Sequence, residues 1–210
     1  MIKLERTSVM NFEGALRGAR NPLNSWAKSD SKYDEKGNYI LGEADLDLGR
    51  RLVSSGPDHR KFIRQIIVSV DITAPLYWWK EYDTYKVGTV ANSCSTMHKI
   101  HSKEFSLDDF SHDRMSGTAL TCLDSIIKCL EDARVKYNET KDKLYWNDMI
   151  QLLPSSYNQM RTCTLSYENL INIYCARRGH KLAEWHEVCD WIENLPYAKY
   201  LILPACKKNK

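Results

Sequence analysis

The sequence lacks several features that would assign it at once to a common class of protein. Neither of the common phosphate-binding motifs, GxxxxGK[ST] and GxGxxG, occurs, so neither a P-loop nor a dinucleotide-binding Rossmann unit is indicated. The apolar runs are all shorter than the roughly 20 residues of a membrane-spanning helix. The opening MIKLERTSVMNFEG has no continuous apolar segment of the signal-peptide kind. We therefore expect a cytoplasmic protein with no membrane partner.

Neither sign of charge is in excess. The chain has 30 lysines and arginines against 27 aspartates and glutamates, a net charge of +3. Such a balance does not point to nucleic acid or to an anionic membrane. The charge balance is still compatible with a small ligand that carries a phosphate, which individual basic residues would have to bind.

The cysteines form no recognisable pattern. There are seven, an odd number, and they are widely spaced with no CxxC pair. In a cytoplasmic protein such cysteines are typically reduced and serve mostly as small buried apolar side chains. We expect reduced thiols.

The length of 210 residues is enough for one domain with a substantial core. We expect a single domain over residues 1–210. Apolar spacing, prolines and glycines predict alternating strands and helices. The predicted elements are a strand at 3–9, a helix that ends near Asn21 and Pro22, a loop over 24–39, a helix that ends at Gly56, a strand at 66–72 covered on both faces, a core-packed amphipathic helix over 119–137, and helices before Pro154, at 168–177 and at 182–195.

The segment ITAPLYWWKEYDTYKVGTVANSCSTMH (72–98) is the best candidate for a site. Pro75 suits the first turn of a helix, and Gly88 stands where that helix would end with positive φ. The hydroxyl and amide groups of Thr89, Asn92 and Ser95 then suit a phosphate or a base edge. They also suit a helix cap and a solvated loop, so the pattern by itself leaves both interpretations open.

Other candidate sites are weaker. His98 and His101 are three residues apart, but no carboxylate–histidine motif accompanies them, so we expect no metal site. No Cys/His nucleophile is indicated. The pair Arg177-Arg178 offers planar forks for phosphate or carboxylate, or equally charges that complement a helix C-terminus.

Two segments carry a resemblance to a known family. HRKFIRQIIVSVDITAPLYWWKEYDTYKVGTVANSCSTMH and LLPSSYNQMRTCTLSYENLINIYCARRGHKLAEWHEV resemble the flavin-dependent thymidylate synthases (ThyX) in order and spacing. The family's strand, proline-led helix, Arg-His-Arg motif and serine- and asparagine-containing loop look like 66–72, Pro75, Thr84-Tyr85-Lys86 and the run from Thr89 to Ser95. FEGALRGARNP is similar to the family's opening helix.

The resemblance implies a fold, ligands and an assembly. It implies an α/β (α+β) fold with a central sheet flanked by helices, a homotetramer, and FAD, dUMP, methylenetetrahydrofolate and NADPH as ligands. Carried over position by position, it implies nucleotide contacts at Glu81, Asn92, Ser95 and Arg177. It implies flavin contacts at Thr84, Tyr85, Lys86, Thr89, Ser166 and Asn172. No catalytic side chain is assigned, because in this family the protein supplies position and electrostatics.

Several family side chains are replaced in this chain. Thr84, Tyr85 and Lys86 stand for Arg-His-Arg, Ser166 and Glu168 stand for a flavin-contacting asparagine and arginine, and only Asn92, Ser95 and Arg177 keep the family's side chains. Two hypotheses follow. One is an FAD-dependent enzyme that methylates dUMP or a related pyrimidine nucleotide. The other is an inactive protein of the same fold that binds a nucleotide-like ligand or a partner protein.

Overall fold

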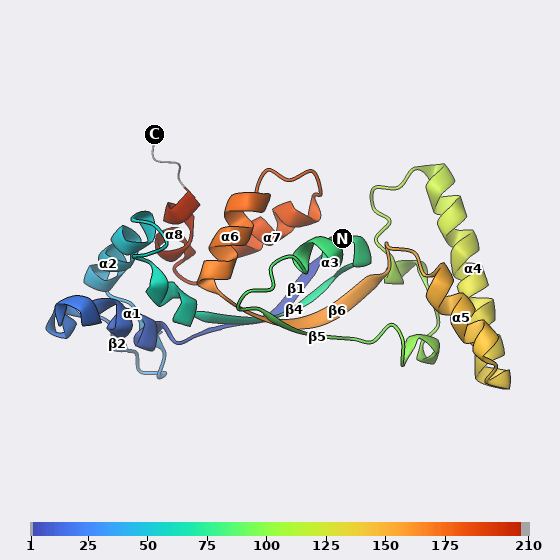
Figure 1. The fold of residues 1–210 in the computed structure, drawn as a ribbon, viewed down its shortest axis with the longest axis horizontal. Coiled ribbons are helices and arrows are strands. Elements are labelled where there is room, and N and C mark those ends of the chain that lie inside the picture. The colour runs from blue at the N-terminus through green and yellow to red at the C-terminus, as the bar shows by residue number, and fades with distance from the viewer. Residues whose placement is uncertain (1, 207–210) are drawn as a thin grey trace. The chain divides into compact units, whose positions relative to one another are not determined.

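The computed structural model of the chain describes residues 2–206. Its main sheet has four strands in the order β1-β4-β6-β5 (Figure 1). These are β1 (Lys3–Met10), β4 (Ile67–Pro75), β6 (Asn158–Ser166) and β5 (Val90–Ser93). Helices accompany this central sheet, which confirms the α/β (α+β) class predicted from the sequence.

Of the eight α-helices in the described residues, six lie close to predicted positions, whereas α3 is shorter than predicted and α8 was not predicted. The eight helices are α1 (Phe12–Arg20), α2 (Glu43–Ser54), α3 (Leu76–Tyr82), α4 (Gly117–Thr140), α5 (Lys143–Leu152), α6 (Tyr167–Arg177), α7 (Glu184–Glu193) and α8 (Ala198–Leu201). Within residues 2–206 no helix combines the length and the apolar character needed to cross a bilayer.

The chain forms two compact units. Unit 1 comprises the residues up to Lys3, Asp71–Thr84 and Asn92–Thr162, and unit 2 comprises Leu4–Val70, Tyr85–Ala91 and the residues from Cys163 onward. The strands β4 and β6 each contribute residues to both units. The single domain over 1–210 therefore stays a prediction.

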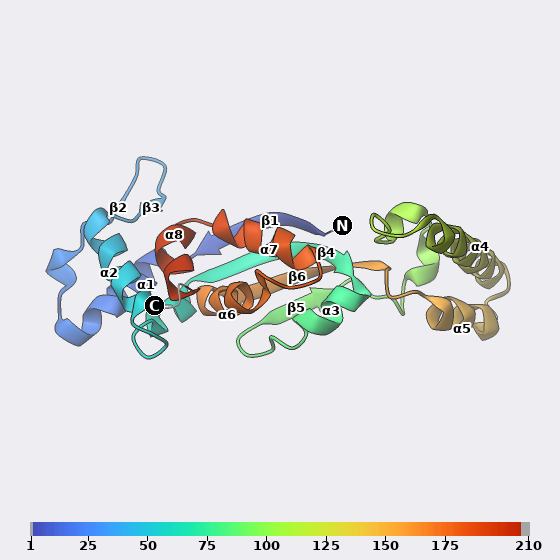
Figure 2. The same cartoon turned by 90° about the horizontal axis from the view of Figure 1, so that it is seen from above.

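Unit 1 is built around the helix pair α4 and α5, which lie side by side (Figures 1 and 2). The Ser116 hydroxyl begins α4 by accepting a hydrogen bond from Ala119 N at 3.4 Å. Leu123, Leu130 and Met149 of the two helices are buried together. The predicted core role of the amphipathic helix over 119–137 is thereby confirmed.

The strand β4 is buried on one face only. Val68, Val70 and Ile72 are at most 3% exposed, whereas the residues between them are half-buried. The prediction of a strand covered on both faces was wrong, because a continuous β-branched run also occurs when one face is merely half-shielded. The strand β6 was missed entirely.

The strands β4 and β6 run antiparallel. At one end Leu76 N donates to Tyr157 O, and at the other Tyr167 N donates to Ile66 O, both at 3.0 Å. Each strand leads directly into a helix, β4 into α3 and β6 into α6. This pairing fixes where both helices begin.

The helix after β4 is shorter than predicted. Pro75 is its N-cap and α3 ends at Tyr82, not at Gly88. The Thr84 hydroxyl donates to Glu81 O at 2.7 Å and so satisfies a carbonyl at the helix end. Gly88 lies in a later turn with a φ of +74°, which confirms the predicted positive φ but not the predicted helix end.

The predicted loop over 24–39 contains regular structure. Lys32 pairs with Ile40 and Tyr33 with Tyr39 in a short antiparallel hairpin formed by β2 (Lys32–Tyr33) and β3 (Tyr39–Ile40). Two-residue strands carry too few apolar positions for a period of two to be recognised.

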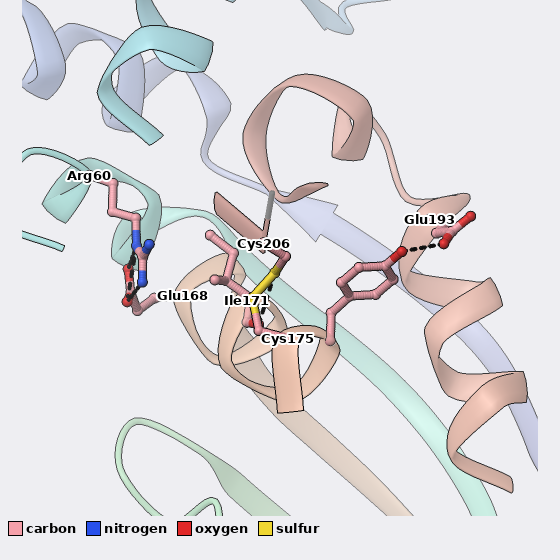
Figure 3. Close-up of a disulfide and its surroundings, with 7 residues drawn as sticks. Arg60, Glu168, Ile171, Cys175, Glu193 and Cys206 are labelled. Atoms are coloured by element: carbon pink, nitrogen blue, oxygen red, sulfur yellow. Dashed lines mark hydrogen bonds and ion pairs between the residues drawn. A yellow bond between two sulfur atoms is a disulfide. The ribbon is translucent and has the colours of Figure 1, made fainter. Parts of the chain in front are cut away.

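Unit 2 contains a disulfide that the sequence analysis did not predict. Cys175 of α6 is bonded to Cys206 at the end of the C-terminal turn η6 (Leu203–Cys206), as Figure 3 shows. The expectation that all seven cysteines are reduced was therefore wrong for these two. Spacing could not reveal the bond, because 31 positions separate the two residues.

Two buried ion pairs also stabilise unit 2. Arg20 is paired with Asp45, which also accepts hydrogen bonds from the hydroxyls of Ser29 and Ser31. Arg60 holds Glu168 of α6 at 2.9 Å, as Figure 3 shows, and both side chains are nearly buried.

Candidate functional site

Arg177 lies at the C-terminal end of α6, against two aromatic rings. Its guanidinium carbon is 4.8 Å from the ring centre of Trp185 and 5.6 Å from that of Tyr85. Trp185, on α7, is fully buried, and Arg177 is half-buried. A guanidinium over aromatic faces is held in place while remaining charged.

Tyr85 completes this cluster through its hydroxyl. Arg177 Nε donates to the Tyr85 hydroxyl oxygen at 2.8 Å, and the rings of Tyr85 and Trp185 lie edge to face at 6.1 Å. Two residues that the resemblance assigned to different ligands, Arg177 to the nucleotide and Tyr85 to the flavin, are thus in direct contact. Their roles toward ligands stay predictions.

The turn that carries Tyr85 is fastened to α6. Asn169 Nδ2 donates to Val87 O at 2.6 Å, and the Thr89 hydroxyl donates to Tyr85 O. The left-handed backbone of Gly88 allows the chain to reverse between them. The turn is therefore held on the surface of α6, and the Thr89 hydroxyl is used within it.

Two further basic residues are close in sequence to this cluster, Lys86 next to Tyr85 and Arg178 next to Arg177. Lys86 is exposed and forms no ion pair within the described part of the chain. The guanidinium carbon of the neighbouring Arg178 lies over the ring of Tyr174 instead, 5.9 Å from its centre. Of the predicted arginine pair, only Arg177 therefore joins the aromatic cluster.

The start of α6 is organised by a capping box. The Ser166 hydroxyl accepts from Asn169 N at 3.4 Å and donates to Asn169 Oδ1 at 2.8 Å, while Ser166 N also donates to Asn169 Oδ1. The predicted flavin contact Ser166 thus uses its hydroxyl within the helix. Asn172, one turn further along, is exposed.

Glu168 forms an ion pair inside unit 2. It accepts three hydrogen bonds from Arg60, at 2.9 to 3.3 Å. Glu168 stands at the position where the resemblance expects a flavin-contacting arginine. In this chain that position is part of a buried ion pair.

The other predicted residues belong to unit 1. Glu81 is half-buried on α3, and Thr84 follows the end of that helix, where its hydroxyl donates to Glu81 O. Asn92 is exposed on the edge strand β5. The Ser95 hydroxyl accepts from Met97 N and His98 N at 3.1 and 3.0 Å, so it forms a local turn.

The tryptophans of α3 are core residues. Trp78 and Trp79 are at most 1% exposed. Trp79 Nε1 donates to Gln159 O, and Arg161 covers its ring at 4.1 Å. These two rings are therefore buried inside the chain and present no exposed face on which a ligand could stack.

Sequence reasoning missed two residues of the site, Asn169 and Trp185. Asn169 could have been found, because a serine followed three residues later by an amide side chain is the signal of a capping box. Nothing in the sequence marks Trp185 as the ring beneath Arg177, since its spacing on α7 equals that of an ordinary core residue. Among residues 2–206 no group of three or more potential metal ligands lies together.

Comparisons with known proteins identify the fold. No family model matches the sequence, and no curated protein matches it. A structure of thymidylate synthase X (ThyX) from Helicobacter pylori with FAD and dUMP is 16% identical, with a TM-score of 0.71 over 99% of this chain and 100% of the other. A second structure of that enzyme with the same ligands gives 0.68 at 16% identity over 98% and 99%.

A related fold occurs in a nucleotide-modifying enzyme. The UMP/dUMP methylase PolB from Streptomyces cacaoi, bound with 5-Br dUMP, has a TM-score of 0.60 at 14% identity over 99% of this chain and 93% of the other. The likeness extends over nearly the whole chain in each case. The chain has the fold of the flavin-dependent thymidylate synthases.

Proposed function

We propose that the protein binds dUMP or a related pyrimidine nucleotide together with FAD, and that it methylates the pyrimidine ring reductively. The observation that carries the proposal is the Tyr85–Arg177–Trp185 cluster, in a chain whose fold matches proteins solved with dUMP and FAD. In the family, reduced flavin supplies hydride and methylenetetrahydrofolate supplies the carbon.

The cluster suits an anionic group. Arg177 is positioned by a hydrogen bond at Nε and by two ring faces, so little side-chain entropy is lost when it binds. Lys86 adds a point charge on the same turn. Together they offer a charge-assisted subsite for a nucleotide phosphate or for the diphosphate of a flavin.

The residues of unit 2 fit a flavin in part. Lys86 and Asn172 are exposed and can donate to flavin oxygens. The hydroxyls of Thr89 and Ser166 already donate to atoms of the chain. We therefore assign flavin contacts primarily to Tyr85, Lys86 and Asn172.

The replaced side chains predict weak binding. Each lost charge-assisted hydrogen bond makes the binding free energy less favourable by about 1.5–3 kcal/mol, which is roughly a 10- to 150-fold increase in Kd. Thr84 has no positive charge where the family has arginine, and Glu168 is negative. We expect nucleotide and flavin affinities well below those of enzymes that keep these arginines.

Three measurements on the purified protein test the proposal. They are the absorption spectrum after addition of FAD and gel filtration, calorimetric titration with dUMP, and release of tritium from 5-tritiated dUMP with FAD, NADPH and methylenetetrahydrofolate present. Retained flavin with tritium release supports the enzyme. The proposal is refuted if the protein binds neither FAD nor dUMP at concentrations that saturate ordinary nucleotide sites.

The neighbouring arginines provide a matched pair of variants. Arg177→Lys keeps the charge but loses the planar stack and the donor to Tyr85, so we expect at least about tenfold weaker dUMP binding. Arg178→Lys makes the same chemical change beside Tyr174. Equal effects of the two variants would contradict the placement of the site.

The second candidate is a nucleotide-binding protein without catalysis. The specific observation in its favour is the Arg60–Glu168 pair, which commits a position expected to contact flavin to an internal ion pair. This candidate predicts dUMP binding that depends on Arg177, together with neither flavin retention nor tritium release. The same three measurements therefore separate the two candidates.

A further inference from the structure

Unit 1 contains a polar cavity of about 560 Å³ that none of the predicted nucleotide or flavin residues lines. Lys3, Thr73 and Asn158 come from β1, β4 and β6, and Asp108, Phe110 and His112 come from the segment that precedes α4. The volume lies within the roughly 300–1,000 Å³ of small-molecule sites.

The wall formed by this segment is fastened to the start of β6. Phe110 forms an antiparallel bridge with Tyr157, and their rings lie 5.6 Å apart. Ser111 N donates to Ser156 O at 2.8 Å, and the Ser111 hydroxyl donates to Asn158 Oδ1 at 2.8 Å. The cavity is therefore formed before any ligand binds, which lowers the entropy lost on binding.

Hydrogen bonds within the wall determine which atoms of Asn158 and His112 can donate or accept toward the cavity. Since Asn158 Oδ1 accepts from Ser111, its amide NH2 is the group left to donate. His112 Nδ1 lies 2.8 Å from Phe110 O. A carbonyl oxygen can only accept, so Nδ1 carries the proton and Nε2 of the neutral ring is an acceptor.

Three more lining side chains have no partner among residues 2–206. These are the Lys3 ammonium, the Thr73 hydroxyl and the Asp108 carboxylate. Lys3 donates, Asp108 accepts and Thr73 does both. With Asn158 and His112, the cavity offers donors and acceptors in nearly equal number.

The charge of the lining argues against an anionic ligand. Two lysines and three aspartates line the cavity, and Lys103 is already paired with Asp109. The lining therefore has no excess of positive charge to attract a phosphate dianion.

We propose that this cavity binds an uncharged polyhydroxylated molecule of mono- or disaccharide size. A sugar hydroxyl donates and accepts at once, so neighbouring hydroxyls can donate to Asp108 and His112 Nε2 while they accept from Asn158 and Lys3. The cavity shares no residue with the proposed nucleotide site, and its existence does not depend on that function.

The test uses the full chain and glucose, ribose and maltose as probes, with inorganic phosphate and dUMP for comparison. Binding is followed by NMR at the side-chain amide of Asn158 and the backbone amide of Thr73. We expect at least one sugar to shift these signals in a saturable way at concentrations up to about 100 mM, a hundredfold above a millimolar Kd. We expect phosphate and dUMP to leave them unchanged.

A pair of variants completes the test. Asp108→Asn removes an exposed charge with no internal partner, so the fold should persist, and we expect at least about tenfold weaker sugar binding. Glu139→Gln makes the matching change on α4 outside the cavity and should leave binding unchanged. The proposal is overturned if no sugar shifts the signals, if phosphate shifts them more strongly, or if Asp108→Asn binds as tightly as the unmodified chain.

Discussion

Reduction of the Cys175–Cys206 bond should destabilise the protein by a calculable amount. The bond closes a loop of 31 positions. In the chain-entropy account, a loop of that size restricts the unfolded chain by about 12 cal/mol/K, which is about 3–4 kcal/mol at 25 °C. Because the bond joins α6 to the C-terminal turn (Figure 3), the loss should appear in the unfolding of unit 2.

Urea denaturation followed by circular dichroism measures this loss. The unmodified chain is compared with and without a dithiol reductant, and Cys175→Ser is treated in the same way. We expect the reductant to lower the free energy of unfolding of the unmodified chain by about 3–4 kcal/mol and to have no effect on Cys175→Ser. If both proteins lose stability equally, or if neither does, the reasoning fails.

Three further outcomes are expected. Burial would raise the pKa of the Asp45 carboxyl, but hydrogen bonds from two serines and from Arg20 outweigh it and lower that pKa. Its stabilising effect is therefore complete above the unfolded value of about 3.9 and is lost as the pH falls through the lower folded value. By urea denaturation, Asp45→Asn should be about 3–5 kcal/mol less stable at pH 7 and should lose less on acidification. Burial raises the pKa of Cys189 to about 11, so peptide mass spectrometry should show much slower alkylation of Cys189 than of exposed Cys94. Gly88→Ala should destabilise the 85–91 turn by about 1–2 kcal/mol, seen as faster hydrogen exchange, because Gly88 has a φ of +74°.

Most of the helices could be predicted because local chemistry marks their ends, but the short α8 was not. Asn21 and Pro22 end α1, Ser116 begins α4, and Pro154 follows α5. Each mark acts within a turn of the residue that carries it. The order of helices along the chain was therefore readable without any long-range information.

The strand β6 was missed because its pattern is ambiguous. NQMRTCTLS contains one regular alternation, in which Cys163 and Leu165 are buried and Thr162 and Thr164 are not, and an irregular start. Its stability comes from pairing with β4, a partner more than 80 positions away, as the Leu76–Tyr157 bond shows. Such pairing leaves no signal in a short window of sequence.

The candidate site was predictable in composition but not in its contacts. The sequence marked Tyr85, Lys86 and Arg177 as site residues, all of which belong to unit 2. The contact between Arg177 and Tyr85 spans 92 positions, and the buried Trp185 beneath Arg177 resembles any core tryptophan. Contacts of that range depend on the fold, and sequence spacing cannot supply them.

The Arg177 cluster predicts that the altered motif keeps one ligand contact. Where the resemblance expects histidine, Tyr85 offers a hydroxyl that Arg177 Nε reaches at 2.8 Å. This bond and the two ring faces orient the guanidinium without any help from the replaced arginines, whereas Glu168 is withdrawn into its pair with Arg60. The first turn of α6 thus has Glu168 where the resemblance expects an arginine, whereas the last turn keeps Arg177. We therefore expect nucleotide binding to depend more on Arg177 than on any other residue of that helix.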